Sequence, residues 1–351
     1  EIGSGLVGSE MCIRDRDTPL EKDEYTFMNV EYRKWQNGTF QAWTTADSRE
    51  TRTIDNMNWY TPSSDYSRTA WGGRIGLQPS SVVGKEGFFR VANCGGRSYL
   101  LDPDNGAVII HGIQHVRPGE STAHKKAFGT RYGSEARWSE ETGKLLADNH
   151  INYISYGSNR IEVFPAAVRG NLLTPKTQKI AYAENLYLLR TFMWDMSKNL
   201  GYAFDDDKYN RLVLLFEPTF ATYIDRLVQE KSALFAGDRH FIGFYLDNEL
   251  PFASYQGTGY ANTEGGGWLV HTQKNRGEFY QNFCLRLLET RNCVGWVHFE
   301  YNDGYDSNGK ASNKGVVSIE YEPYESFLSQ MRQLNLSVHS LIDYYDIKSV
   351  Q

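Results

Sequence analysis

The pattern of hydrophobic and polar positions changes character near residue 106. From about residue 17 to residue 105 the chain is polar and rich in Gly and Thr, with short aromatic-containing runs at 39–43 and 87–91. Short runs separated by turn residues predict an antiparallel β-rich module. The run 97–101 leads into Asp102-Pro-Asp-Asn-Gly106, where Pro and Asn-Gly favour a tight turn. We therefore assign residues 17–105 to one N-terminal module.

From residue 106 onward, strand patterns alternate with helix patterns. The predicted strands cover residues 107–115, 150–155, 211–217, 241–246 and 293–299. The predicted helices cover residues 136–148, 179–200, 223–235, 277–291 and 324–334. This alternation favours the α/β class, with a parallel sheet or barrel over residues 106–345.

The strand predicted at 241–246 ends abruptly in Asp247, Asn248 and Glu249. The six residues before them are mostly apolar or aromatic, which is typical of a parallel strand buried on both faces. The carboxyl ends of such strands hold the chemistry of α/β barrels. A carboxylic acid at such a place can act as a general acid, and the Asn-Glu pair resembles the position of the proton donor in glycosidases. The alternative is a helix N-cap, a role that Asp and Asn often have after a strand.

Composition and charge narrow the possible partners. The net charge is -6 and there is no long basic run, so a nucleic acid is not an expected partner. No apolar stretch is long enough to span a bilayer. Aromatic residues make up 14% of the chain, which fits either sugar-stacking surfaces or a large aromatic core. The four Cys lack metal-ligand spacing and no phosphate-binding loop occurs, so we expect no metal and no cofactor.

The first residues have an unusual origin. Residues 6–16, Leu-Val-Gly-Ser-Glu-Met-Cys-Ile-Arg-Asp-Arg, match the translation of a common sequencing adapter. We treat residues 1–16 as an artefact and leave them out of the fold prediction, as one would a cloning scar. We expect the remainder to be an assembled environmental fragment whose true start, with any signal peptide, is lost.

Several short segments between residues 87 and 334 are similar to known sequence motifs. They are Gly87-Phe-Phe-Arg90, Leu101-Asp-Pro-Asp104, Gly112-Ile-Gln-His115, Leu246-Asp-Asn-Glu249, Arg276-Gly-Glu-Phe-Tyr-Gln-Asn-Phe283, Val294-Gly-Trp-Val-His-Phe-Glu-Tyr-Asn-Asp303, Asn313-Lys-Gly-Val316 and Tyr321-Glu-Pro-Tyr324. On these segments the chain resembles the retaining glycoside hydrolases built on (β/α)8 TIM-type barrels. Within them it is most similar to β-agarases and related enzymes that cut red-algal galactans.

The resemblance implies roles for particular residues. Glu249 would be the general acid/base, and Asn248 would donate a hydrogen bond to the sugar 2-hydroxyl. The implied substrate-binding residues are His115, Trp296, His298, Glu300, Tyr301 and Trp268. Core packing is the alternative for Trp296 and Trp268, and a structural histidine is the alternative for His115. The implied partner is a polysaccharide or oligosaccharide, and a polymeric substrate implies a secreted, periplasmic or cell-surface protein.

The chain departs from the family pattern at the nucleophile. A retaining enzyme needs a second carboxylate about 5 Å from the first. Only 45 residues separate Glu249 from Val294, whereas three βα units need on the order of 90 residues. We therefore expect that the barrel lacks its fifth to seventh strands, and that a stretch near residues 251–255 is missing. Glu264 could replace the nucleophile, although three glycines follow it, and Glu300 is a further candidate.

Two other functional classes compete with the hydrolase. A non-catalytic carbohydrate-binding protein on the same scaffold would have no Asp or Glu about 5 Å from Glu249. A barrel enzyme of small-molecule metabolism would have a phosphate-binding turn or metal ligands at its strand ends, and the sequence has neither pattern.

Overall fold

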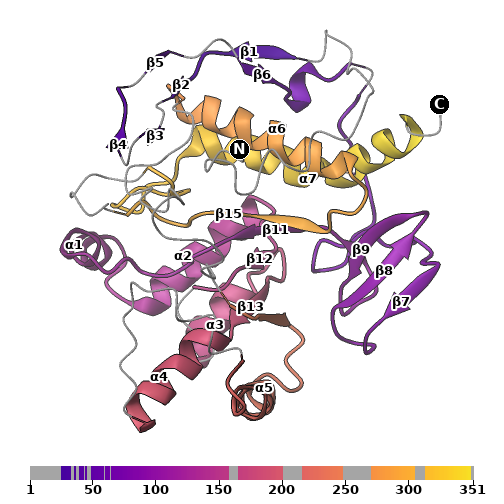
Figure 1. Cartoon of the computed structure of the whole chain (residues 1–351). Helices are drawn as coiled ribbons and strands as arrows, with labels where there is room; N and C mark the ends of the chain where they lie inside the picture. Colours follow the sequence, from indigo (N-terminus) through magenta and orange to yellow (C-terminus); the bar gives the residue numbers. More distant parts are fainter. Residues whose placement is uncertain are drawn as a thin grey trace.

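The computed structural model describes most of the chain after residue 24. The described residues are 25–32, 35–36, 39–42, 44–45, 49–58, 60–63, 65–157, 165–200, 216–247, 270–304 and 313–348. Figure 1 shows a mixed α/β structure in which strands of the N-terminal part lie beside two long helices from the C-terminal part. None of the described helices is long and apolar enough to cross a membrane.

The described strands of the N-terminal part pair in antiparallel fashion, as predicted. Three two-stranded pairs join β1 (Thr26–Met28) to β6 (Arg49–Thr51), β2 (Glu31–Tyr32) to β5 (Thr44–Thr45) and β3 (Trp35–Gln36) to β4 (Thr39–Phe40). The short 3₁₀ helix η2 (Ile54–Asn56) follows. A four-stranded sheet then has the order β10-β9-β8-β7, with β7 (Ser81–Val83), β8 (Arg90–Cys94), β9 (Arg97–Leu101) and β10 (Ala107–Val108).

The turn predicted at residues 102–106 joins β9 to β10. The Asp102 carboxylate accepts hydrogen bonds from the backbone amides of Asp104, at 2.9 Å, and Gly106, at 3.0 Å. Asn105 has a φ of 68°, the left-handed conformation that Asn tolerates better than most residues. This local hydrogen bonding explains why the sequence signal was sufficient to place the turn.

The described strands after residue 108 form one parallel sheet, whereas residues 107–108 of the predicted strand at 107–115 belong to the antiparallel sheet as β10. The strands of the parallel sheet are β11 (Ile110–Ile113), β12 (Tyr153–Ile154), β13 (Ala181–Asn185), β14 (Phe241–Tyr245) and β15 (Gly295–His298). Their order is β14-β13-β12-β11-β15, and all four pairings are parallel. A (β/α)8 barrel would place its first four strands and its last strand in this order. The five described strands form an open sheet, so a closed barrel stays a prediction.

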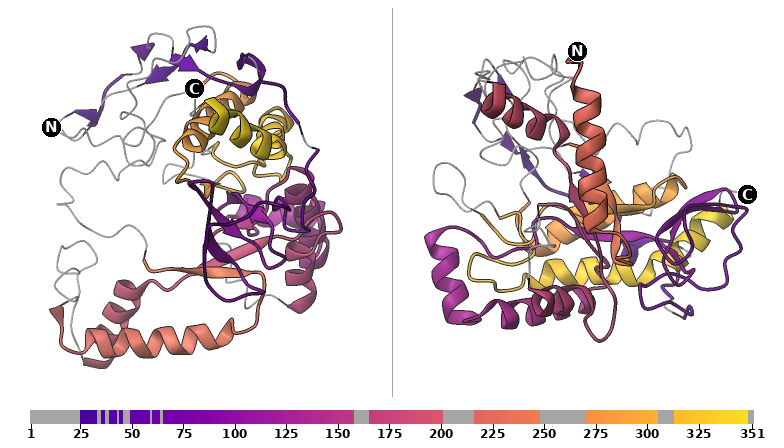
Figure 2. Two further views of the ribbon diagram at one scale, coloured as in Figure 1. Left: turned by 90° about the vertical axis from the view of Figure 1, so that its right-hand side faces the viewer. Right: turned by 90° about the horizontal axis from the view of Figure 1, so that it is seen from below.

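Helices connect and cover these strands. The described helices are α1 (Thr122–Arg131), α2 (Glu135–Asp148), α3 (Ala166–Leu173), α4 (Leu188–Leu200), α5 (Phe220–Leu234), α6 (Gln273–Glu289) and α7 (Glu325–Lys348). Ser134 caps α2 and Thr272 caps α6, because each side chain accepts a hydrogen bond from a free amide of the first turn. The left panel of Figure 2 shows α6 and α7 end-on and side by side.

The core has two parts on the helix-covered side of the parallel sheet. One packs β11–β13 against α2 and α3, with Ile113, Ile154 and Tyr182 from the strands. The other packs α6 and α7 against both the parallel sheet and the N-terminal sheet, so that Tyr99 and Leu101 share a cluster with Leu285 and Leu334. The N-terminal sheet is therefore built into the same core as the C-terminal helices.

A third cluster lies on the opposite, inner face of the parallel sheet. It contains Ile110, Tyr153 and Ala183 from three strands, with Trp71 and Val108 from the N-terminal part. Trp71 is buried there, and its indole Nε1 donates a hydrogen bond to Asp104 at 3.0 Å.

The predicted helix at 179–200 is wrong over its first part. Residues 181–185 form β13, between β12 and β14, and the helix α4 begins at Leu188. Successive side chains Ala181 and Tyr182 point to opposite faces of the sheet, and both are buried, so the strand has no polar face to reveal its period. Of the predicted strand at 211–217, residues 211–215 lie outside the described residues, and Phe216 is 86% exposed.

The remaining elements follow the predictions closely, with two additions. The strands predicted at 241–246 and 293–299 are β14 and β15, and the helices predicted at 136–148, 223–235 and 277–291 are α2, α5 and α6. The last helix, predicted at 324–334, continues as α7 to Lys348. Helices α1 and α3 were not predicted.

Candidate active site

The carboxyl ends of the two neighbouring strands β11 and β15 bring His115 and Glu300 together. His115 Nδ1 lies 2.9 Å from Glu300 Oε2, and both side chains are partly exposed, at 25% and 16%. An imidazole nitrogen that faces a carboxylate carries a proton, so Nδ1 donates to Glu300, and in the neutral form of the ring Nε2 is then an acceptor. The pair can therefore accept a hydrogen bond from a ligand hydroxyl or remove a proton from it.

Backbone geometry holds the His115 ring in place. His115 has a φ of 55°, and a Cβ added to Gly157 would lie 2.3 Å from the imidazole Cδ2. Gly157 itself has a φ of 77°, so this position after β12 favours glycine for both its conformation and its lack of a side chain. The ring of Phe299 meets the imidazole edge-on at 5.0 Å and is 43% exposed.

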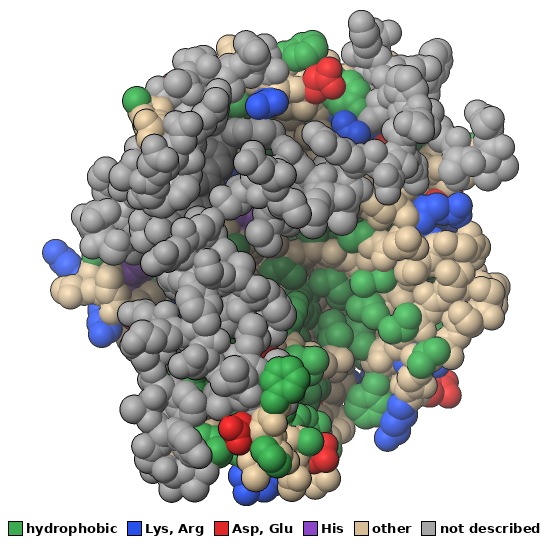
Figure 3. Space-filling view, viewed as in Figure 1, with side chains coloured by type: hydrophobic (Ala, Val, Ile, Leu, Met, Phe, Trp, Pro, Cys, Tyr) green, Lys and Arg blue, Asp and Glu red, His purple; other side chains and the backbone are tan. Residues whose placement is uncertain are grey.

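Hydroxyl groups converge on the inner face of the sheet beside this pair. The Tyr245 hydroxyl lies 3.2 Å from the Tyr153 hydroxyl and 3.4 Å from Ser155 Oγ. These hydrogen bonds connect the carboxyl end of β14 with that of β12. The rings of Tyr156 and Tyr245 lie 4.6 Å apart at 55°. Burial raises the pKa of Tyr153, so its hydroxyl stays protonated and can donate. In Figure 3 hydrophobic side chains gather in a hollow of the described surface.

A glycine makes room for this network. A Cβ on Gly112 would lie 2.6 Å from Tyr153 Cδ1 and 3.1 Å from Val297 Cγ2. The ring of Tyr153 and the side chain of Val297 therefore meet above Gly112 on the inner face. Val297 is 36% exposed, so this face carries apolar surface next to the hydroxyl groups.

Of the predicted triplet Asp247-Asn248-Glu249, the structure describes Asp247. Its carboxylate accepts a hydrogen bond from the backbone amide of Leu189 at 2.9 Å, in the first turn of α4. Asp247 thus caps the start of α4, a helix that precedes β14 in the chain, whereas the predicted alternative was an N-cap for the helix after the strand and stays a prediction. Asn248 and Glu249, and likewise Glu264 and Trp268, lie outside the described residues.

Trp296 and His298 lie on the helix-covered side of β15 and not on its inner face. Trp296 is only 6% exposed, and its Nε1 donates to the Tyr280 hydroxyl of α6 at 2.6 Å. His298 Nε2 donates to the Lys314 carbonyl at 2.9 Å, and burial followed by the charge of Arg276 lowers the pKa of His298 to about 3. Trp296 is therefore placed as the core-packing alternative expects. The positions of Trp296 and His298 give no support to a role in lining a cleft.

Tyr301 is also buried, in the core beneath α2. It is 1% exposed, its hydroxyl is 3.0 Å from Thr142 Oγ1, and burial raises its pKa. A sugar-stacking role for Tyr301 therefore has no exposed ring to support it. Of the predicted substrate-binding residues that the structure describes, only His115 and Glu300 come together at the carboxyl edge of the sheet.

The sequence prediction missed the hydroxyl network and Phe299. Tyr153 and Ser155 alternate along the predicted strand at 150–155, which is the signal for two side chains on one face. Among the described residues no group of three or more His, Cys, Asp or Glu side chains is placed to hold a metal ion. The chemistry that the described arrangement supports is hydrogen bonding to hydroxyl groups, with one imidazole–carboxylate pair available for proton transfer.

Comparisons with known proteins were made on both sequence and structure. No family model matches the sequence, and no curated protein matches it. The solved structure of BpGH50 matches with 19% sequence identity and a TM-score of 0.72, over 94% of this chain and 98% of that chain. An agarase, AgWH50C, matches with 12% identity and a TM-score of 0.49, over 80% and 67%. An exo-beta-agarase matches with 12% identity and a TM-score of 0.46, over 80% and 69%. The likeness to BpGH50 shows that this chain has the same fold as that protein.

Proposed function

We propose that this protein is an agarase-like glycoside hydrolase that cleaves β-galactosidic bonds of an algal galactan with retention of configuration. The observation that carries the proposal is that β14 ends just before Asp247-Asn248-Glu249 in the sequence, and that its carboxyl end and the His115–Glu300 pair lie at the same end of the parallel strands. The motif resemblance and the fold shared with BpGH50 support it.

In this proposal Glu249 has two roles. It protonates the departing sugar oxygen, and it then deprotonates the water that releases the sugar. Asn248 donates to the sugar 2-hydroxyl. His115 Nε2 accepts a hydrogen bond from a further hydroxyl, because Glu300 holds the proton on Nδ1. A polymeric substrate implies a secreted, periplasmic or cell-surface protein.

A retaining mechanism also requires a carboxylate that acts as the nucleophile. Strands β14 and β15 are at opposite edges of the described sheet, four strand spacings apart. At about 4.8 Å per spacing this is roughly 19 Å along the sheet, so only strong curvature brings Glu300 within about 5 Å of Glu249. Glu264 is the other candidate. The engagement of Glu300 with His115 favours a binding role for it, which keeps a non-catalytic carbohydrate-binding protein as the second candidate function.

The proposed loss of strands five to seven has its own test. The alignment with BpGH50 spans nearly equal shares of the two chains, so a protein of similar length has this fold. Sequencing the source DNA across residues 251–255 decides it: an intact, well-covered junction would sink the proposal of a lost stretch.

The first experiment measures hydrolysis of agarose, porphyran and an aryl β-galactoside. Wild-type protein is compared with Glu249→Gln and with Glu230→Gln, a matched control on an exposed carboxylate of α5. We expect activity in the wild type and the control and its loss in Glu249→Gln. The anomer formed first, followed by NMR, reports retention. Glu264→Gln and Glu300→Gln then identify the nucleophile.

The alternative outcome is equally informative. Folded wild-type protein that binds these glycans without cleaving them would refute the hydrolase and leave the carbohydrate-binding function. Activity that persists in Glu249→Gln would remove the proposed acid/base.

A further inference from the structure

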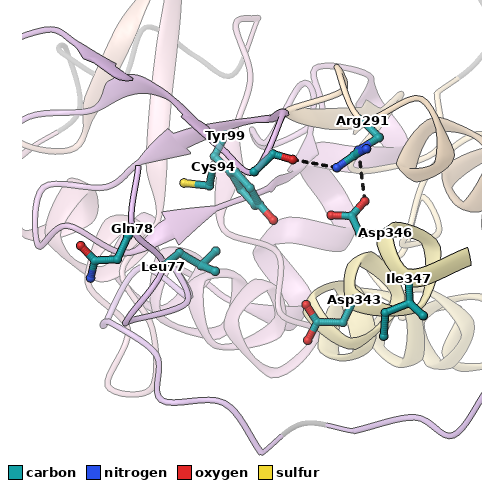
Figure 4. Close-up of a pocket in the computed structure, with 9 residues that line it drawn as sticks. Leu77, Gln78, Cys94, Tyr99, Arg291, Asp343, Asp346 and Ile347 are labelled. Carbon is teal, nitrogen blue, oxygen red and sulfur yellow. Dashed lines mark hydrogen bonds and ion pairs between the residues drawn. The ribbon is translucent and has the colours of Figure 1, made fainter. Parts of the chain in front are cut away.

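A pocket of about 710 Å³ lies where the N-terminal sheet meets the end of α7 (Figure 4). Tyr99 and Cys94 come from β9 and β8, Leu77 from the segment before β7, and Asp346 and Ile347 from the last turns of α7. Its volume is within the range of about 300–1,000 Å³ that is typical of small-molecule sites. Arg291, which precedes β15, also lines it, so the pocket is on the side of the amino ends of the strands, away from His115 and Glu300.

The charges around the pocket are paired with one another. Asp346 lies 2.6 Å from Arg97 and 3.3 Å from Arg291, and Asp343 lies 2.7 Å from Arg74. Each carboxylate therefore faces a guanidinium group. A charge on a ligand would add little to its affinity for this pocket, because a cationic or an anionic group would have to compete with an existing ion pair.

The Tyr99 hydroxyl is the group that points to a ligand. The Tyr99 side chain is 3% exposed, and its hydroxyl makes no hydrogen bond with any other residue that the structure describes. Figure 4 shows this hydroxyl directed into the pocket, on the side of Asp346. A hydroxyl group that has no partner within the described protein and opens onto a pocket is available to hydrogen-bond a molecule that enters it.

The walls differ in polarity, which restricts the chemistry of that occupant. Asp343 and Asp346 present carboxylate oxygens one turn apart on α7, and Tyr99 supplies a hydroxyl. Leu77 and Ile347 supply aliphatic surface. A molecule with hydroxyl groups on its edge and C–H groups on its face fits both kinds of wall. A neutral sugar ring has this character.

We propose that this pocket binds a neutral saccharide of one to three rings and is a second, non-catalytic sugar site. For the choice of sugar it rests on the proposed function, but the pocket and its chemistry do not depend on catalysis. A saccharide hydroxyl hydrogen-bonds to Tyr99, and neighbouring hydroxyls donate to the carboxylates of α7.

The test measures binding of a galactose-containing disaccharide from agarose by ligand-observed NMR titration. Turnover is prevented by the background substitution Glu249→Gln. In this background Ile347→Trp fills the pocket from an exposed position, and Leu234→Trp is the matched control, since the two residues are 63% and 62% exposed. We expect Ile347→Trp to abolish one of two binding events and Leu234→Trp to leave both.

A second variant tests the hydroxyl itself. Tyr99→Phe keeps the ring and removes one hydrogen bond, so we expect the affinity of the pocket to fall about 2- to 10-fold. Galactosamine, the cationic analogue of galactose, tests the charge argument and is expected to bind no better than galactose.

Several outcomes would overturn the proposal. They are equal binding by Ile347→Trp and Leu234→Trp, unchanged affinity in Tyr99→Phe, or galactosamine binding tighter by about tenfold or more. Hydrolysis of the aryl β-galactoside by Ile347→Trp with Glu249 intact separates the two proposals. If Ile347→Trp hydrolyses this substrate normally but the pocket no longer binds the disaccharide, the saccharide site is supported. If neither the wild type nor any variant hydrolyses the substrate while the pocket still binds the disaccharide, only the proposed hydrolase function is refuted.

Discussion

Substitution of Trp296 by Phe tests whether this residue is a core residue or a ligand contact. Trp296 is 6% exposed, stacks on His111 at 5.1 Å and 29°, and donates to the Tyr280 hydroxyl at 2.6 Å. The substitution leaves that buried hydroxyl without its donor, which costs about 1–3 kcal/mol. The lost ring leaves a cavity that costs less than the roughly 3–5 kcal/mol of a full truncation to Ala. We expect the free energy of unfolding to fall by about 2–4 kcal/mol.

Urea denaturation followed by circular dichroism measures this change. With a urea dependence of about 3 kcal/mol per M, the midpoint is expected to fall by about 1 M. Tyr280→Phe removes the partner of the same hydrogen bond. The double variant should therefore lose less than the sum of the two single variants, because the two sites are coupled.

A different result would refute the core assignment of Trp296. This result is a free energy of unfolding of Trp296→Phe within about 0.5 kcal/mol of the wild type, which is the usual effect of a surface substitution, together with weaker saccharide binding. It would indicate that the indole contacts a ligand. Reduced stability with unchanged saccharide binding is the outcome that the geometry favours.

Three further predictions concern the frame around the site. Gly112→Ala should lower stability by about 1–3 kcal/mol, because its Cβ would lie 2.6 Å from the Tyr153 ring, and a thermal melt against wild type checks this. Asp247→Ala should cost about 1 kcal/mol by removing the acceptor for the Leu189 amide, measured by urea unfolding; Asp247→Asn, which keeps a capping oxygen, should cost less, and equal losses would contradict the capping role. Burial lowers the pKa of His298 to about 3, whereas its pKa in the unfolded chain is about 6.5, so the unfolded chain binds the extra proton between these pH values. The free energy of unfolding should therefore fall as the pH falls from about 6.5 towards 3, by at most about 1.4 kcal/mol per pH unit from this residue, and His298→Asn should reduce that slope.

The elements that sequence predicted well have a clear period or a clear boundary. Helices α2 and α6 have apolar residues on one face and a Ser or Thr cap at their start. The sequence predicts a helix over β13 because Leu186 and Leu189 fit a helical apolar spacing, and the first three residues of the strand are all buried, so they show no alternation of apolar and polar positions. Periodicity alone does not separate a buried strand from a buried helix of this length.

The site was harder to predict than the fold. The sequence placed His115 and Glu300 at strand ends, and the adjacency of β11 and β15 brings them together. It could not tell which alternate residues of β15 face inward, since Trp296 and Val297 are both apolar and the strand is covered on the helix side. That choice depends on how α6 and α7 pack against the sheet, and the pattern of residues within the strand does not contain this information.

The N-terminal sheet has no interior of its own. Tyr99 and Leu101 are buried by Leu285 of α6 and Leu334 of α7, and Arg97 is held in place by Asp346 and the Leu288 carbonyl. A protease cut between residues 105 and 106 would therefore not release two stable fragments, and the sheet could not be exchanged for that of a relative without redesigning α6 and α7. The protein should melt in a single transition, with the first and last parts of the chain losing their structure together.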